Sequence, residues 1–159
     1  MSLASFLYGI PPRVRVLTLW MSHSAVVASL PFTMDLHFDY PKYLDLIDGF
    51  YLAAGGSFAL TNDYWSWPKE LDASQKGGGR IVNAVMHFIE KTSCSADEAL
   101  EKVKLLAVEY ERKALEQRKL ILVQNPDLPA DVRRFMDGII WVLGGASLWS
   151  AKCKRYHEF

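Results

Sequence analysis

Proline positions constrain the fold of this 159-residue chain more than any other feature of its sequence. A proline inside a helix removes a backbone hydrogen bond and clashes with the preceding turn, so helices tend to begin beside prolines or end before them. The seven prolines stand at positions 11, 12, 31, 41, 68, 126 and 129, and the stretches between them carry helical rather than alternating apolar spacing. The sequence therefore predicts an all-α protein, a bundle of about five helices.

Local start signals define the expected helices more narrowly. Pro11 and Pro12 suit the entrance of a first helix, and Pro41 suits the first turn of a long second one. Ser95 and Glu98 form a capping box, in which each residue's side chain satisfies the other's backbone donor. The expected helices span about 13–28, 41–70, 81–91, from 96 onward, and from 127 to about 152.

Glycines occur at two places where their presence requires a physical explanation. Gly49, Gly55 and Gly56 lie inside the long second helix, where each costs up to about 1 kcal/mol relative to alanine. The run 77–79 breaks the chain, and the residues after it lack the Lys-Ser/Thr pair of a phosphate-binding loop. We interpret this run as a flexible connector.

The charge balance excludes some classes of function. Lys+Arg and Asp+Glu number 18 each, so the chain lacks the basic excess that is typical of nucleic-acid binders. The apolar stretch 14–34 is interrupted by Arg15 and Pro31, which favours a buried helix over a membrane-spanning one. Cys94 and Cys153 are isolated thiols without the spacing of a metal or redox pair. We expect a soluble, cytoplasmic protein.

One stretch of the long second helix carries candidate metal ligands. Asn62, Ser66 and Glu70 stand at i, i+4 and i+8, which places them within about 80° of one another on one helix face. All three side chains offer oxygen, which Mg²⁺ prefers, and Mg²⁺ commonly takes water and substrate phosphates as its other ligands. Spacing alone leaves another interpretation open, a helix end with incidental polar residues. The neighbouring aromatic side chains favour the metal site.

The segment from Asn62 to Glu70 also resembles a known motif. It is similar to the second metal motif of class I terpene cyclases, (Asn/Asp)-Asp-x-x-(Ser/Thr)-x-x-x-Glu, and matches it in full through Asn62, Asp63, Ser66 and Glu70. The Trp-Pro-Lys-Glu form of its ending looks most like fungal cyclases, including those fused to a prenyltransferase that make fusicoccane- or ophiobolin-type skeletons.

Two later segments extend the resemblance over nearly the whole chain. The stretch 77–85, which contains Asn83, resembles the family's segment after the motif. Trp149, followed by Arg155 and Tyr156, resembles the family's closing signature. The resemblance implies that residues 1–159 form the C-terminal half of a class I terpene cyclase domain, a partial terpene-synthase (isoprenoid synthase) helical bundle.

The resemblance implies roles for the matching residues. In the family, the motif's Asn, Ser and Glu hold one Mg²⁺, the Lys before the Glu and the Arg of the Arg-Tyr pair contact diphosphate, and an upstream Arg senses the diphosphate. The implied metal ligands are Asn62, Ser66 and Glu70, and the implied catalytic residues are Lys69, Arg155, Tyr156 and the sensor Arg13, with Arg15 as second choice.

Three residues of the same helix are candidates for the substrate cavity. Tyr51, Gly55 and Phe58 precede Asn62 by eleven, seven and four residues and so share its face. The two aromatic rings could stabilise a carbocation and the glycine could leave room for substrate. An ordinary aromatic core is an equally good interpretation of each.

The chain also departs from the family's pattern. The family's first motif, an Asp-rich helix that binds the other Mg²⁺ ions, lies upstream of the sensor arginine, and nothing before Arg13 matches it. The local acidic cluster in 34–39 follows the sensor helix, and we interpret its acids as solvated loop residues. We therefore expect half a helical barrel with an exposed apolar face, a surface that promotes self-association.

The expected function follows from the resemblance. It implies a Mg²⁺-dependent lyase that ionises and cyclises geranylgeranyl, geranylfarnesyl or farnesyl diphosphate, truncated and inactive as this chain alone. Two alternatives remain: a non-catalytic remnant that binds magnesium diphosphate weakly or not at all, and a helical interaction module that docks on another chain.

We expect no turnover of these three diphosphates by the 159-residue chain alone. Without the Asp-rich helix, most of the diphosphate charge that grows during ionisation has no metal to neutralise it, and each 1.36 kcal/mol of lost transition-state stabilisation costs about tenfold in rate. Incubation with each substrate and Mg²⁺, followed by gas chromatography–mass spectrometry, measures this. A cyclised hydrocarbon that disappears in Glu70→Gln would contradict the expectation.

Overall fold

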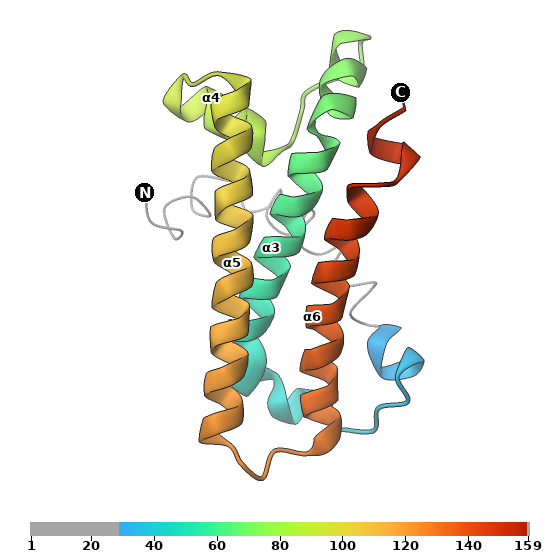
Figure 1. Cartoon of the computed structure of the whole chain (residues 1–159), viewed down its shortest axis with the longest axis vertical. Helices are drawn as coiled ribbons and strands as arrows, with labels where there is room; N and C mark the ends of the chain where they lie inside the picture. The colour runs from blue at the N-terminus through green and yellow to red at the C-terminus, as the bar shows by residue number, and fades with distance from the viewer. Residues whose placement is uncertain (1–28, 159) are drawn as a thin grey trace.

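Figure 1 shows the computed structural model of the chain, which describes residues 29–158. This part contains α3 (Tyr40–Gln75), α4 (Ala84–Thr92), α5 (Ala96–Gln124), α6 (Ala130–Ser150) and the short 3-10 helix η1 (Lys154–Tyr156). Residues 29–33 are helical as well, and no strand occurs among the residues described. The all-α fold is thus confirmed, whereas the helix expected over 13–28 lies outside the described residues.

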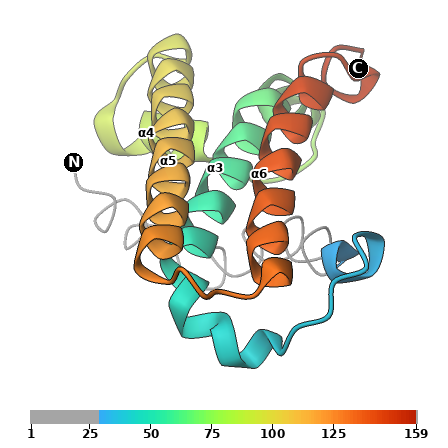
Figure 2. The same ribbon diagram turned by 60° about the horizontal axis from the view of Figure 1, so that its bottom comes forward.

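Helix α3 is the central element. It packs against α5, α6, α4 and η1, and α5 lies on one side of it and α6 on the other (Figures 1 and 2). The short α4 packs against both α3 and α5. The largest fully buried side chains come from all four α-helices: Ile47, Phe50, Val85, Val103, Val132, Phe135, Met136 and Ile139.

The helix starts follow the signals in the sequence. Pro41 lies in the first turn of α3, and the helix continues through Pro68 to Gln75. The capping box of α5 is complete, because Ser95 Oγ accepts a hydrogen bond from the Glu98 backbone while Glu98 Oε2 accepts one from the Ser95 backbone, at 3.3 and 2.8 Å. Both predictions are confirmed.

A close approach between α3 and α5 explains one of the costly glycines. A Cβ atom on Gly56 would lie 2.4 Å from two carbons of the Tyr110 ring, far inside van der Waals contact. Tyr110 is itself almost fully buried. The ring therefore occupies the space that any larger residue at position 56 would need.

The glycine run at 77–79 has a specific conformation. Gly77 and Gly79 have φ of +93° and +86°, which side chains rarely adopt, and a Cβ on Gly78 would lie 2.5 Å from the Ala73 carbonyl oxygen. Ser74 Oγ donates to the Gly79 carbonyl at 2.9 Å. The run is a connector that requires glycine, and it turns the chain after α3 toward α4.

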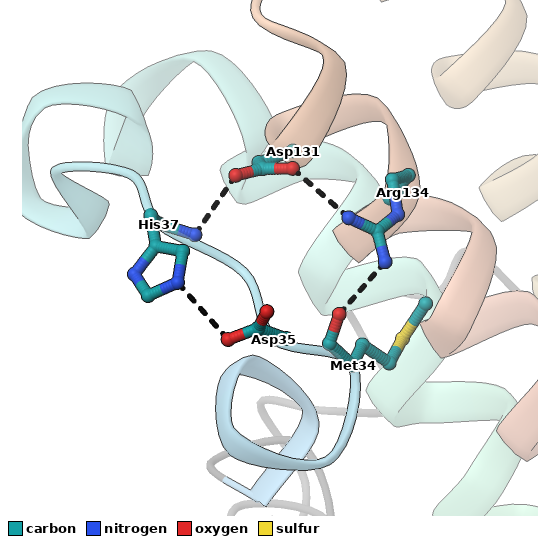
Figure 3. Close-up of polar contacts among 5 residues, drawn as sticks. All are labelled: Met34, Asp35, His37, Asp131 and Arg134. Carbon is teal, nitrogen blue, oxygen red and sulfur yellow. Dashed lines mark hydrogen bonds and ion pairs between the residues drawn. The ribbon is translucent and has the colours of Figure 1, made fainter.

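The segment before α3 is attached to the start of α6 (Figure 3). The His37 backbone N–H donates to Asp131 Oδ2 at 2.8 Å, and Arg134 donates to the Met34 carbonyl at 2.7 Å. Asp35 is exposed and pairs with the His37 ring. Among the residues described, no three histidine, cysteine or acidic side chains are grouped to hold a metal.

Large apolar side chains remain exposed on α6. Trp141, Leu148 and Trp149 keep 69, 60 and 55% of their surface accessible. The expected apolar face of a half-barrel, and self-association through it, remain predictions. Within the described residues, no helix is long and apolar enough to cross a membrane.

We expect Gly56→Ala to lower the free energy of unfolding by about 1–3 kcal/mol, because the added methyl must displace the Tyr110 ring in a packed interior. The matched control is Gly144→Ala on α6, where a Cβ would meet nothing within 4 Å. That change should stabilise the protein by up to about 1 kcal/mol through helix propensity. Urea unfolding followed by circular dichroism measures both free energies of unfolding. Equal effects of the two changes would contradict the close contact between Gly56 and Tyr110.

Candidate metal centre

The three candidate ligands lie in the C-terminal half of α3 and face two hydrogen-bond donors. Asn62 Oδ1 accepts from the Tyr156 hydroxyl at 2.9 Å. Ser66 Oγ and Glu70 Oε2 both accept from Asn83 Nδ2, at 3.3 and 3.2 Å. Ser66 is buried and the other two are half-buried. Since one nitrogen lies within hydrogen-bond distance of both the hydroxyl and the carboxylate, these two oxygens face the same point.

Asp63 accepts hydrogen bonds from two residues at the start of α4, Asn83 and Ala84. Asn83 Nδ2 donates to the Asp63 carbonyl at 2.9 Å, and Asp63 Oδ2 accepts from the Ala84 backbone N–H at 2.8 Å. Asn83 Oδ1 also caps α4 by accepting from the Val85 N–H at 2.8 Å. The α4 N-terminus is therefore fastened to α3 beside the candidate ligands.

The Asp63 carboxyl is buried in this junction. Burial, the largest cause, raises its pKa to about 7. The hydrogen bond from the Ala84 N–H lowers the pKa, the negative charge of Glu70 raises it, and a hydrogen bond from Asn62 lowers it. The Asp63 carboxylate is thus engaged with the backbone of α4.

The C-terminal segment brings the closing Trp…Arg-Tyr residues onto the site. Tyr156 follows Asn62 by 94 residues and is buried, and its ring packs edge-on against Trp149 at 5.8 Å. The neighbouring His157 ring packs against Trp65 at 5.7 Å. Burial raises the pKa of the Tyr156 hydroxyl, so it stays a hydrogen-bond donor at neutral pH. Two motifs far apart in the sequence thus meet directly.

The donor set fits a hard divalent cation. Its atoms are an amide oxygen, a hydroxyl oxygen and a carboxylate oxygen, the ligand type that Mg²⁺ takes. Each of these oxygens already accepts a hydrogen bond, so each presents a lone pair toward a partial positive charge. That these oxygens share one cation stays a prediction.

The other predicted site residues are placed less closely. Lys69 is half-buried and Arg155 is exposed, with the Arg155 guanidinium carbon 5.9 Å from the centre of the Tyr156 ring. Within residues 29–158, neither cation forms an ion pair, so both charges are available to an anion. Arg13 and Arg15 lie outside the described residues.

The candidate cavity residues pack into the protein on α3. Gly55 is buried, and Tyr51 and Phe58 are half-buried against the core. Burial raises the pKa of the Tyr51 hydroxyl. Their placement is compatible with both a cavity wall and an ordinary aromatic core.

Sequence reasoning named Asn83 only as part of a resembling segment and missed its contacts. Its cap on α4 was the one available signal, because an asparagine directly before a helical pattern is a favoured N-cap. The hydrogen bonds of Asn83 Nδ2 go to residues 13 to 20 positions earlier in the chain, and no local sequence pattern encodes them.

The chain is similar to known proteins over much of its length. Residues 17–113, more than half of the chain, match the family described as terpene synthase family 2, C-terminal metal binding. The chain is 40% identical over 108 residues to sesterterpene synthase btcA of Colletotrichum orbiculare, a match that covers 67% of this chain and 15% of that protein.

Two further relatives also match most of this chain and a small part of their own length. Fusicoccadiene synthase of Phomopsis amygdali is 33% identical over 99 residues, covering 62% of this chain and 14% of the relative. Terpene cyclase ATR13 of Stachybotrys chlorohalonatus is 33% identical over 102 residues, covering 64% and 26%. The chain thus spans about a quarter or less of the length of these relatives.

We expect Asp63→Ala to lower the free energy of unfolding by about 1–3 kcal/mol, because it leaves the buried Ala84 N–H without an acceptor. Asp63→Asn keeps an acceptor oxygen and should cost less. The control Asp45→Ala removes an exposed acid from the same helix and should stay within about 0.5 kcal/mol of the parent protein. Urea unfolding measures the three free energies. An Asp63→Ala protein as stable as the parent would contradict the hydrogen bond between Asp63 and the Ala84 N–H.

Proposed function

Since the chain belongs to terpene synthase family 2, C-terminal metal binding, we propose that it supplies a Mg²⁺–diphosphate site of a terpene cyclase. Asn62, Ser66 and Glu70 are the proposed ligands of one Mg²⁺. The proposed substrate class is the prenyl diphosphates, among them geranylgeranyl, geranylfarnesyl and farnesyl diphosphate.

One observation carries the proposal. Among residues 29–158, the oxygens of Asn62, Ser66 and Glu70 accept hydrogen bonds from two donors, Tyr156 Oη and Asn83 Nδ2, at 2.9 to 3.3 Å. Those donors come from separate elements that converge on one face of α3. An incidental set of polar residues at an exposed helix end would not be gathered in this way.

The chain's own residues would divide the work at this site. The bound Mg²⁺ would supply charge neutralisation of the departing diphosphate. Lys69 lies on α3 with the ligands, Arg155 lies on η1 beside Tyr156, and within the described residues neither forms an ion pair. Both would add positive charge to a bound diphosphate. Tyr156 would hold the Asn62 amide so that its oxygen faces the site.

The aromatic residues near the site would serve a second purpose. Trp67 is buried beside Ser66, and the half-buried Tyr51 and Phe58 lie earlier on α3. Aromatic faces stabilise a cation, and a dry cavity protects it from water. We propose that these side chains belong to the wall of the cyclisation cavity.

We expect Glu70→Gln to weaken Mg²⁺ binding in the presence of inorganic pyrophosphate by more than about tenfold, because it removes the single formal charge of the ligand set. Asp63→Asn should weaken it less, since the Asp63 carboxylate is engaged with α4. Tryptophan fluorescence, with Trp65 and Trp67 flanking Ser66, reports the titration.

One further variant and the parent protein complete this test. Glu111→Gln removes an exposed acid from α5 and should leave the titration unchanged. A parent protein that does not respond to magnesium pyrophosphate would contradict the proposed function and favour a helical interaction module. A larger loss in Asp63→Asn than in Glu70→Gln would mean that the coordinating face is assigned wrongly.

A further inference from the structure

The amide nitrogen of Asn83 contacts more acceptors than it has hydrogens. It lies 2.9 Å from the Asp63 carbonyl oxygen, 3.2 Å from Glu70 Oε2 and 3.3 Å from Ser66 Oγ. A side-chain amide carries two N–H hydrogens, so at least one of them is shared between two acceptors. The 2.9 Å bond to the carbonyl takes one hydrogen most directly, which leaves the other directed between Ser66 and Glu70.

The residue type at position 83 is more specific than its capping role requires. Capping needs only an acceptor, and aspartate or serine would cap α4 about as well as asparagine. Asparagine alone among the good caps also offers an N–H₂ group at the other branch of the same side chain. In this protein Oδ1 serves α4 and Nδ2 serves α3, so both ends of the amide are used.

The surroundings of Asn83 keep this amide in a fixed place. Asn83 is buried, with 7% of its surface accessible. The adjacent Ala84 N–H is bound by Asp63, and the glycine turn at 77–79 sets the path by which the chain returns to α3. A donor held on both sides can orient a carboxylate, whereas a mobile one cannot.

We propose that Asn83 is a positioning residue of the metal site, which orients the Glu70 carboxylate and the Ser66 hydroxyl so that their remaining lone pairs meet the cation. The inference rests on the proposed function, because the two side chains it acts on are the proposed ligands. Hydrogen bonds to ligating carboxylates are a common feature of metal sites, and their loss typically weakens metal binding by about 10–100-fold.

Asn83→Ser tests the proposal, because serine keeps a capping oxygen for the Val85 N–H and removes the amide donor. We expect Mg²⁺ affinity, titrated with inorganic pyrophosphate, to fall by about 10–100-fold. The matched control is Asn125→Ser. Asn125 is the C-cap of α5 and, like Asn83, donates through Nδ2, in its case to the Ile121 carbonyl at 2.9 Å. Its change should leave the affinity as it was.

Nuclear magnetic resonance of the unaltered chain gives a second readout that needs no variant to fold. Adding MgCl₂ and pyrophosphate should shift the side-chain N–H₂ signals of Asn83, while those of Asn125 stay in place. Such a shift would place Asn83 beside the metal, and the affinity of Asn83→Ser then tells a positioning residue from a neighbour that only caps α4. Without metal, Asn83→Ser should also move the ¹³C signal of the Glu70 carboxyl.

The outcomes separate the two proposals. The positioning role alone is wrong if the unaltered chain binds magnesium pyrophosphate and Glu70→Gln does not, but Asn83→Ser still binds it as well as the parent. In that case the N–H₂ signals of Asn83 would also stay in place when the metal is added. If the unaltered chain does not bind magnesium pyrophosphate at all, the proposed function and the positioning role both fail.

Discussion

The contact between Gly56 and Tyr110 sets the spacing of the two longest helices, and the site depends on that spacing. With no side chain at position 56, the Tyr110 ring lies against the backbone of α3. Helix α4 packs on α3 and α5 together, so its position follows from theirs. Asn83 stands at the first turn of α4. A wider separation of α3 and α5 would therefore draw the Asn83 amide away from Ser66 and Glu70.

Around that packing, the site uses the same helix for structure and for chemistry. Successive residues of α3 face different partners: Asn62 is held by Tyr156, and Asp63 is bound to the backbone of α4. The 100° step between neighbours on a helix makes this division possible. In this chain the acid secures α4, while the amide faces the proposed cation.

The sequence predicted those features that depend on neighbours along the chain. The capping box of Ser95 and Glu98, the proline in the first turn of α3 and the shared face of Asn62, Ser66 and Glu70 all follow from spacing of eight residues or fewer. What it could not predict are contacts between distant segments. The reason for Gly56 is a ring on another helix, and the role of Asn83 depends on how a glycine turn returns the chain to α3.

The hydrogen bond between Asn62 and Tyr156 has a consequence for the order in which parts of the protein fold during synthesis. Its two partners are 94 residues apart, so at ribosomal rates of about 5–20 residues per second Tyr156 is made roughly 5–20 s after Asn62. Helix α3 can pair with α5 in that interval, because both are complete before η1 is translated. Asn62 spends this time without its hydroxyl partner. The packing of α3 and α5 can thus form before the contact between Asn62 and Tyr156, which η1 completes.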